Sequence, residues 1–318
     1  MQAGAGYWGL RERGAWIDLS DCAIIRVEGQ DRIDFLHRLT TINVLALRPG
    51  QGAYGFLLSP QGRILVDFVL LNLPEQCWLD TQRHFCSRLL GLMEQYLFME
   101  DVRVAEAGDS LVAAAVEGPE SGQLLQALGL PAPDEPWAIQ TSGPFVIMRA
   151  SWTGQLGWRI YGTAGAVQQL RASAQATGIP VASAAEAERV RLENAKPHYG
   201  VDFDDRRLPH ETQLLCGISF GKGCYPGQEI VERVQARGQV QWLLVPVELD
   251  AVEPPPAGSS VESNGAQVGE ITSATYSPAL GRVVGLAYIR SSHAVPGREF
   301  RVGRMSCRVR ASAPYQGP

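Results

Sequence analysis

Residues 220–229 of the chain read FGKGCYPGQE, from Phe220 to Glu229. Three glycines and one proline within these ten residues predict a loop, because glycine permits backbone conformations that side chains forbid and proline cannot continue a helix. The next stretch, QEIVERVQARG, has apolar side chains at helical spacing, with Ile230 and Val234 expected to face inward. We therefore expect a rigid glycine-rich loop that leads directly into a helix.

Within this loop, Lys222 precedes Cys224 by two residues, and the predicted helix begins just after the cysteine. A nearby positive charge and a helix N-terminus both favour a thiolate over a thiol. The pattern therefore indicates a reactive thiol at Cys224 with Lys222 beside it. The alternative is that Cys224 is a small buried residue and that the glycines only turn the chain. Cys216 could pair with Cys224 or share a metal with it, but two cysteines at this spacing do not favour a metal site, and we predict none.

The chain before this loop alternates strand-like and helix-like segments. Residues 22–44 predict a strand and then a helix, and residues 52–73 predict two strands around a turn at Ser59–Gly62. An apolar stripe at helical period predicts a helix from His84 to about Asp101, with Tyr96 in the core. A second hairpin turns at Thr153–Gly154, and another helix starts near Ser183. This order suggests an α+β body built from split βαβ units.

The character of the chain changes between Gly238 and Val245. Short β-rich runs follow, separated by the turn pairs Asn264–Gly265, Ser277–Pro278 and Pro296–Gly297. Several short strands at regular spacing predict a small all-β barrel at the C-terminal end.

Composition and charge narrow the possible classes of protein. The 318 residues suggest about two or three domains, and a formal charge of −5 provides no overall positive field for nucleic acid, so direct RNA contact is not expected. No apolar run is long enough to span a membrane. Six cysteines without a C-x-x-C pair predict free thiols in a reducing compartment, so we expect a cytoplasmic protein. The phosphate-loop, dinucleotide, H-E-x-x-H and G-x-S-x-G patterns are all absent.

The stretch KGCYPGQE, from Lys222 to Glu229, resembles the KGCYxGQE signature of the YgfZ family. These folate-binding proteins are related in fold to the aminomethyltransferase, or T-protein, of the glycine cleavage system. The segments GQDRIDFLHRLTTINV and RLENAKPHYGVD are similar to the corresponding parts of the family, and VGEITSATYSP resembles the T-protein's C-terminal barrel. The resemblance spans residues 18 to 310.

The resemblance implies an α+β, T-protein-like fold: a three-part arrangement of ferredoxin-like split βαβ units around a central cavity, with a C-terminal β-barrel. The implied folate-binding body covers residues 1–240, with a second subdomain inserted at roughly 110–182, and the implied barrel covers residues 241–318. The implied ligand is tetrahydrofolate. The implied function is an accessory role in the assembly or repair of iron–sulfur clusters, including those of a tRNA-methylthiolating enzyme, with iron–sulfur apo-proteins or a scaffold as partners.

By position in the resemblance, Lys222 and Cys224 are the functional pair. Arg191, Glu193 and Tyr199 are implied to lie near the folate cavity. Four further residues are implied to shape the loop, namely Tyr225, Gly227, Gln228 and Glu229.

Two departures from the T-protein pattern bear on its chemistry. The T-protein carries two acids in its G-I-L-D-D strand, whereas here R-I-L-V-D keeps only Asp67, which is a candidate ligand contact or a hydrogen-bonded structural acid. In the T-protein, acids of the segment TGEDGxEI hydrogen-bond the pterin. The corresponding segment here reads TGQLGWRI, so Gln155 and Arg159 occupy the positions of those acids. Gln155 can still bond the pterin through its amide, and Glu193 or Glu211 are candidate substitutes for the missing acids. The alternative function is a folate-dependent aminomethyltransferase or other one-carbon transferase, so whether the protein is an enzyme stays open here.

Overall fold

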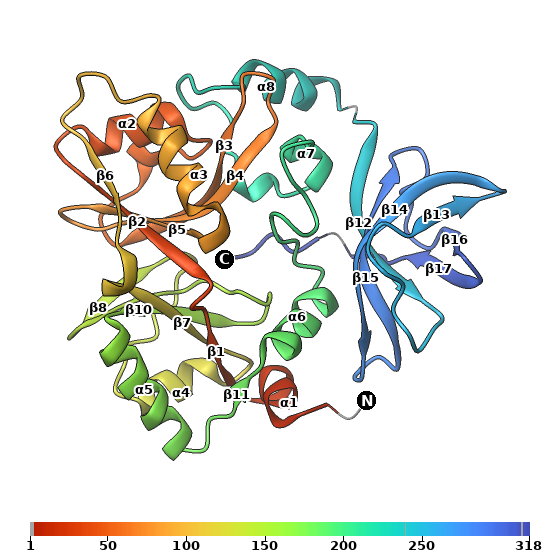
Figure 1. Ribbon diagram of the computed structural model, residues 1–318, viewed down its shortest axis with the longest axis horizontal. Helices are drawn as coiled ribbons and strands as arrows, with labels where there is room; N and C mark the ends of the chain where they lie inside the picture. Colours follow the sequence, from red (N-terminus) through yellow and green to blue (C-terminus); the bar gives the residue numbers. More distant parts are fainter. Residues whose placement is uncertain (1–2, 239, 313) are drawn as a thin grey trace.

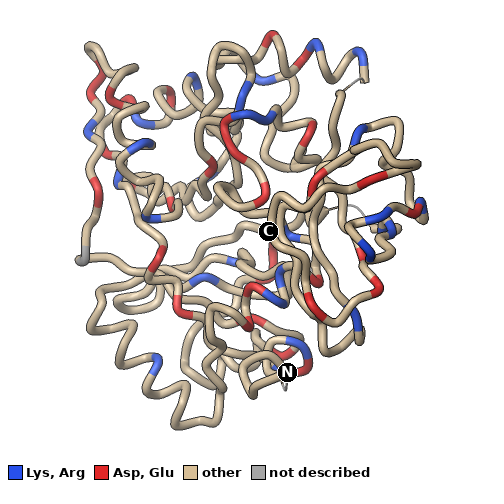
Figure 2. Tube along the Cα trace, turned by 45° about the vertical axis from the view of Figure 1, so that its right-hand side comes forward, with Lys and Arg blue, Asp and Glu red and all other residues tan. Residues whose placement is uncertain are grey.

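The computed structural model describes residues 3–238, 240–312 and 314–318. Figure 1 shows two layered units of sheet and helix and a separate β-barrel, with the C-terminus near the centre of the molecule. Lys and Arg residues are interspersed with Asp and Glu residues over all three parts (Figure 2). No helix among the described residues is long and apolar enough to cross a membrane.

The first sheet has five antiparallel strands in the order β3–β4–β5–β2–β6. They are β2 (Cys22–Glu28), β3 (Gln51–Leu58), β4 (Ile64–Asn72), β5 (Cys77–Gln82) and β6 (Arg103–Glu106). Helices α2 (Arg32–Leu39) and α3 (Arg83–Glu94) cover one face of this sheet. A short 3₁₀ helix, η1 (Val44–Ala46), follows α2. Val66, Phe68 and Leu70 of β4 join the apolar core beneath the two α-helices.

The second sheet has six strands in the order β11–β1–β7–β10–β9–β8. They are β1 (Ala15–Asp18), β7 (Val112–Glu117), β8 (Ile139–Ser142), β9 (Phe145–Met148), β10 (Gly157–Gly162) and β11 (Val181–Ala182). Helices α4 (Ser121–Ala127) and α5 (Ala164–Ala176) pack on its outer face, and η2 (Gly108–Ser110) precedes β7. Strand β1, from near the start of the chain, therefore completes a sheet whose other members follow residue 111.

The inner faces of the two sheets share one core. Val69 and Leu71 of β4 lie in the same apolar cluster as Ala113 and Ala115 of β7. Because successive side chains of a strand point to opposite faces, Val69 and Leu71 face the second sheet, whereas Val66, Phe68 and Leu70 face α2 and α3. This alternation decides which polar residues of β4, β5 and β10 lie between the sheets.

Six further strands close into a barrel in the order β12–β15–β14–β13–β16–β17. They are β12 (Trp242–Leu249), β13 (Ser260–Ser263), β14 (Ala266–Ser277), β15 (Arg282–Arg290), β16 (Glu299–Val302) and β17 (Met305–Val309). The remaining helices are α1 (Ala5–Glu12), α6 (Ala184–Glu193), α7 (Pro209–Thr212), η3 (Leu215–Gly217) and α8 (Gln228–Arg237). Helices α6 and α7 contact the barrel, so they join it to the layered units.

The predicted α+β fold with a C-terminal β-barrel is confirmed. The turn at Ser59–Gly62 joins β3 to β4, and α6 begins after Ser183, whose side chain forms a capping box with Glu186. The domain boundaries at residues 240 and 110–182 stay a prediction.

The predicted helix from His84 to Asp101 is too long. Helix α3 ends at Glu94, and Tyr96 is 39% exposed instead of buried. The Glu100 carboxylate accepts hydrogen bonds from the backbone N–H groups of Phe98 at 2.9 Å and Met99 at 3.1 Å. These bonds close a local turn, which replaces the helical hydrogen bonds that the apolar spacing predicted.

A buried carboxylate ties α6 to the barrel. Asp202, only 2% exposed, accepts hydrogen bonds from Arg191 Nη1 at 2.6 Å, from the backbone N–H of His198 at 2.9 Å and from Thr272 Oγ1 at 2.8 Å. The hydroxyl of Ser273 donates a further bond. This single carboxylate therefore connects α6, the segment after it and barrel strand β14.

Asp202→Ala should lower the free energy of unfolding by about 3–5 kcal/mol, because it removes the buried carboxylate that is paired with the buried Arg191 guanidinium. Chemical denaturation measures the change. Asp34→Ala, which removes an exposed pair with Arg38, is the control and should cost about 0.5 kcal/mol or less. Equal losses in the two variants would contradict the structural role of Asp202.

Candidate functional site

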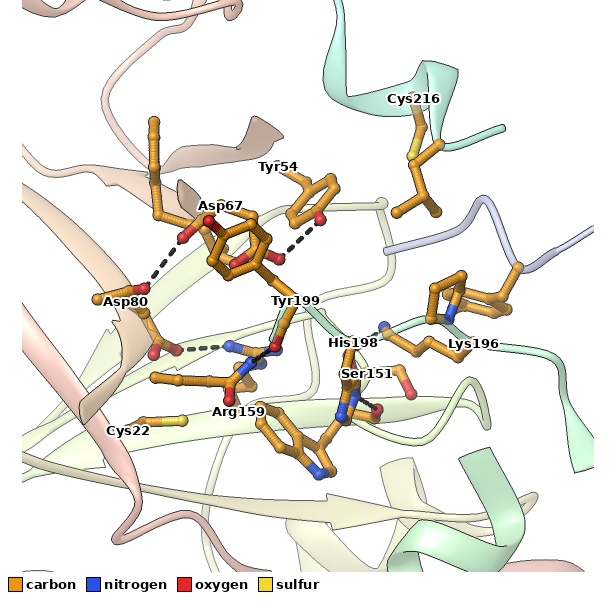
Figure 3. Close-up of a pocket in the computed structure, with 18 of the residues that line it drawn as sticks. Cys22, Tyr54, Asp67, Asp80, Ser151, Arg159, Lys196, His198, Tyr199 and Cys216 are labelled. Carbon is orange, nitrogen blue, oxygen red and sulfur yellow. Dashed lines mark hydrogen bonds and ion pairs between the residues drawn. The ribbon is translucent and has the colours of Figure 1, made fainter. Parts of the chain in front are cut away.

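A cavity opens where the two sheets face each other (Figure 3). Strands β3, β4, β5 and β10 contribute to its walls, together with residues 151–152, the segment 196–199 after α6, and the C-terminal residues Tyr315 and Gly317. Parts of the chain that are far apart in sequence therefore meet at one site.

The alternation of β-strands explains the polar residues in this cavity. Asp67 lies between Val66 and Phe68 on β4, and both neighbours point into the core beneath α2 and α3. Asp67 therefore points the other way, toward the second sheet. By the same rule Asp80 on β5 and Arg159 on β10 point between the sheets.

Asp67 is an acidic residue in the cavity wall that makes no ion pair among the described residues. The hydroxyl of Tyr54 donates a hydrogen bond of 2.8 Å to its Oδ2. Burial raises the pKa of Asp67 to about 6, although the bond from Tyr54 and the charge of Arg159 act in the opposite direction. A carboxyl group with this pKa exchanges its proton near neutral pH, so it can serve as a hydrogen-bond acceptor or as a general acid or base.

Asp80 and Arg159 form an ion pair that crosses from one sheet to the other. Arg159 Nη1 donates to Asp80 Oδ2 at 2.5 Å, and the hydroxyl of Tyr161 donates to the same oxygen at 2.7 Å. The two charged residues are 6% and 2% exposed. The guanidinium also lies over the ring of Trp152, 5.5 Å from its centroid.

Lys196 and His198 line the cavity from the segment after α6. Lys196 Nζ donates to the carbonyl oxygen of Ser151 at 2.6 Å and lies 4.5 Å from the centroid of the Tyr315 ring. Burial lowers the pKa of Lys196 to about 7, helped by the charge of Arg159. Burial, with the nearby positive charges of Arg191 and Lys196, also lowers the pKa of His198 well below its ordinary value.

Of the residues expected near a cavity, Asp67 and Tyr199 line it. The Tyr199 hydroxyl donates to the carbonyl oxygen of Leu65 at 2.6 Å, and the Tyr199 carbonyl accepts from Gln82 Nε2 at 2.7 Å. Tyr199 therefore connects the segment after α6 to the first sheet.

Four other residues expected near the ligand lie outside the described lining. Arg191 is occupied by Glu188 and Asp202, and Glu193 accepts bonds of 2.6 Å from Tyr7 and from Ser277. The bond from Ser277 joins α6 to barrel strand β14, and the bond from Tyr7 joins α6 to α1. Glu211 accepts from the backbone N–H of Leu208 at 3.0 Å and so caps α7, and the side chain of Gln155 is absent from the described lining. As ligand contacts, all four stay predictions.

Lys222 is buried against the end of α2. Its ammonium group donates to the carbonyl oxygens of His37, of Thr40 at 2.5 Å and of Ile42 at 2.8 Å. Burial lowers the pKa of Lys222 to about 8, so the ammonium form still predominates at pH 7. Because these three carbonyls use all three N–H bonds, none remains for the thiol of Cys224. The structure thus gives Lys222 a capping role that the sequence pattern did not predict.

Cys224 itself is exposed, which contradicts the alternative of a small buried residue. The loop that carries it is fixed from both sides. Tyr225 is 7% exposed and lies under the Lys222 ammonium, and Gln228 Nε2 donates to the carbonyl oxygen of Lys222 at 3.3 Å. Gly227 has φ of 81°, and a Cβ atom there would lie 2.5 Å from the carbonyl oxygen of Ser59.

The rest of the loop and the other cysteines have distinct positions. Glu229 is exposed and pairs with Arg233 one helical turn later on α8. On that helix Val231 is the buried residue, whereas the expected Ile230 and Val234 are half-buried. Cys216 lies in the cavity lining, and all six cysteines are free thiols, so the possible Cys216–Cys224 disulfide is not formed.

Sequence reasoning missed Asp80, Lys196 and His198 as cavity residues. Asp80 stands alone in the apolar strand CWLDTQ, which is the same signal that selected Asp67. Lys196 and His198 lie within the stretch RLENAKPHYGVD, beside the selected Tyr199, but no local pattern there indicates which side chains point into a cavity.

Comparison with known families accounts for nearly the whole chain. Residues 2–222 match the family described as the GCVT N-terminal domain, and residues 243–315 match the glycine cleavage T-protein C-terminal barrel domain. The chain therefore belongs to the glycine cleavage T-protein family. The T-protein-like fold expected from the resemblance is confirmed, whereas the finer assignment to the YgfZ type stays a prediction.

Individual relatives are distant. The chain is 27% identical to an aminomethyltransferase of Streptomyces coelicolor, over 91% of this chain and 82% of that protein. It is 29% identical to a mitochondrial aminomethyltransferase of Gallus gallus, over 92% and 78% of the two chains. A putative chloroplastic transferase of Arabidopsis thaliana is 27% identical, over 94% and 70%. The crystal structure of aminomethyltransferase T from Bartonella henselae, at 20% identity, shares the fold with a TM-score of 0.89 over 98% of this chain and 90% of that one.

The raised pKa of Asp67 predicts a specific pH dependence of stability. The folded state binds this proton more tightly than the unfolded state, so the wild type should lose stability relative to Asp67→Asn as pH rises from about 4 to 6. The relative loss should be at most about 3 kcal/mol, because one pKa unit corresponds to about 1.4 kcal/mol. Urea denaturation of both proteins at pH 4 and pH 7 measures it, and a pH-independent difference would contradict the prediction.

Lys222→Met should lower the free energy of unfolding by about 2–4 kcal/mol, since it leaves three buried carbonyl oxygens without their charged donor. The matched control is Arg237→Met, which removes an exposed cation at the end of α8 and should change stability by less than about 0.5 kcal/mol. Denaturation curves that coincide for the two variants would show that the cap is unimportant.

Proposed function

We propose that the protein binds tetrahydrofolate in the cavity between its two sheets. The observation that carries this proposal is the Asp67 carboxyl, which points into the cavity and has its pKa raised to about 6 by burial. A pterin presents ring and amino N–H donors, and a carboxylate is a strong acceptor for such donors. Membership of a family that contains aminomethyltransferases supports the same ligand.

We further propose that this folate-binding protein is an accessory factor in the assembly or repair of iron–sulfur clusters in the cytoplasm. Cys224 supports this role, because a thiol that exchanges sulfur or contacts a cluster on another protein must be exposed, and Cys224 is. The loop that holds it is packed closely against Ser59 at Gly227 and lies outside the described cavity lining. The sequence of the loop resembles the signature of the YgfZ family. Members of that family support such clusters, including the cluster of a tRNA-methylthiolating enzyme. The partners would be iron–sulfur apo-proteins or a scaffold.

The second candidate is a folate-dependent aminomethyltransferase or other one-carbon transferase. The names of the relatives favour it. Arg159 argues against it, because the expected pterin-gripping acid is replaced by a cation already paired with Asp80. A transferase should release methylene-tetrahydrofolate when mixed with an aminomethylated lipoyl carrier and tetrahydrofolate, and an accessory protein should not.

Calorimetric titration of tetrahydrofolate tests the binding proposal. The wild type and Cys224→Ala should bind with similar affinity, since the thiol lies outside the described lining, and Asp67→Asn should bind about tenfold more weakly because it loses a charged acceptor. A wild type that does not bind would overturn the proposal.

The role of Cys224 is tested in cells that carry Cys224→Ala in place of the wild type. Iron–sulfur enzyme activity should fall in these cells while folate binding by the purified variant persists. The control is Arg237→Met, which changes an exposed side chain of α8 outside the described cavity lining. Normal iron–sulfur activity with Cys224→Ala would remove the thiol from the proposal and leave folate binding unaffected.

A further inference from the structure

Three of the charged or imidazole side chains that line the cavity each have a polar atom that no hydrogen bond among the described residues occupies. Asp67 Oδ1, Arg159 Nη2 and His198 Nδ1 make no hydrogen bond to another described residue. None of the three is among the buried polar atoms that lack partners, so none is fully enclosed by protein, and their three residues line the cavity. The first is an acceptor and the second is a donor, and the character of the third depends on where the imidazole carries its proton.

The hydrogen bond of His198 decides its tautomer. Nε2 lies 3.3 Å from the carbonyl oxygen of Trp152, and a carbonyl oxygen can only accept. Nε2 therefore carries the proton and donates it. Burial and the neighbouring cations Arg191 and Lys196 lower the pKa of His198, which keeps the ring neutral at physiological pH. In a neutral ring protonated at Nε2, Nδ1 has a free lone pair.

The imidazole is also held in place. Its ring lies against the ring of Trp152, with centroids 4.4 Å apart, and the backbone N–H of His198 donates to the buried Asp202 at 2.9 Å. Three contacts therefore hold the imidazole in place: the packing against Trp152, the hydrogen bond of Nε2 and the hydrogen bond of the His198 backbone N–H. Figure 3 shows His198 beside Lys196 and Ser151, on the side of the cavity away from Asp80. A fixed acceptor loses little side-chain entropy when a ligand binds.

We propose that His198 is a specificity-determining residue of the cavity, whose Nδ1 accepts a hydrogen bond from an N–H group of the bound pterin. This inference rests on the proposed folate binding and deepens it. His198 takes over part of the acceptor role that the sequence comparison expects from acids at the positions of Gln155 and Arg159. A neutral acceptor suits this position because it makes the bond without placing another negative charge in a buried wall.

The hydrogen-bonding character of these three atoms indicates what kind of ligand they would complement. Asp67 and His198 accept, and the Arg159 guanidinium donates. Their complement is a planar heterocycle with N–H donors and at least one acceptor, which is the pattern of a pterin with its lactam group and amino group. The Trp152 ring, which already contacts both His198 and Arg159, adds an aromatic surface to the same side of the cavity.

The first test needs no ligand. The ¹⁵N chemical shifts of the histidine ring nitrogens in the free, labelled protein show which nitrogen of His198 carries the proton, and His198→Phe identifies the resonances. The expected result is a neutral ring with the proton on Nε2 at pH 7. A proton on Nδ1, or a doubly protonated ring, would overturn the inference whatever the protein binds.

The second test is calorimetric titration of tetrahydrofolate into three variants and the wild type. His198→Phe keeps a ring against Trp152 but removes the lone pair, and it should weaken binding about tenfold or more. His198→Asn keeps an acceptor oxygen near the position of Nδ1 and should bind within about threefold of the wild type. His210→Phe is the matched control, because His210 lies outside the described lining and hydrogen bonds to Gln235, and it should bind like the wild type.

The outcomes separate this inference from the proposed function. If the wild type binds and His198→Phe binds equally well, His198 is not a ligand contact and the inference alone fails. If the wild type does not bind, the proposed function fails and the inference fails with it. Near-wild-type binding by His198→Asn, beside weak binding by a correctly folded His198→Phe, supports the inference, since a merely structural role in the ring packing would favour the phenylalanine variant.

Discussion

The ion pair between Asp80 and Arg159 is the interaction on which the layered part of the molecule depends. It joins β5 of the first sheet to β10 of the second at 2.5 Å, with both side chains almost fully buried. Elsewhere the inner faces of the sheets meet through apolar residues. A buried pair of opposite charges is tolerated only when each charge has its partner in place, so it fixes how the two sheets lie relative to each other. The cavity opens beside this pair, and Asp67 and His198 line it from different parts of the chain.

A second set of contacts separates ligand binding from thiol chemistry. Asp202 holds α6, the backbone of His198 and barrel strand β14 together, so the cavity segment 196–199 is anchored to the barrel. The loop with Cys224 is anchored elsewhere, by the Lys222 ammonium at the end of α2 and by Gly227 against the β3–β4 turn. The cavity and the exposed thiol of Cys224 are therefore held by separate contacts, so a mutation can change one without disturbing the other.

The position of Arg159 changes the chemistry expected of the cavity. A cation that is paired across the sheets cannot act as the acceptor for pterin donors, so in the proposed folate complex Asp67 and His198 are the acceptors. Lys196, with its pKa lowered to about 7, and the ring of Tyr315 close the same site from the side of the C-terminal segment. The cavity thus combines one acid that titrates near neutral pH with cations and aromatic rings, which suits recognition of a planar heterocycle.

The sequence by itself determined the elements and the fold class, because apolar periodicity and turn residues are local properties of the chain. It identified the β3–β4 hairpin, α6 with its cap, the barrel strands and the glycine loop, and an isolated acid in an apolar strand singled out Asp67. Its local rules failed at Tyr96, where the Glu100 carboxylate ends the helix early. Only the tertiary structure decided the partners of the charged residues. Lys222 is occupied by carbonyl oxygens of a distant segment, and Arg191 by Glu188 and Asp202. Asp80, Lys196 and His198 reach the cavity because packing brings their strands and loops together.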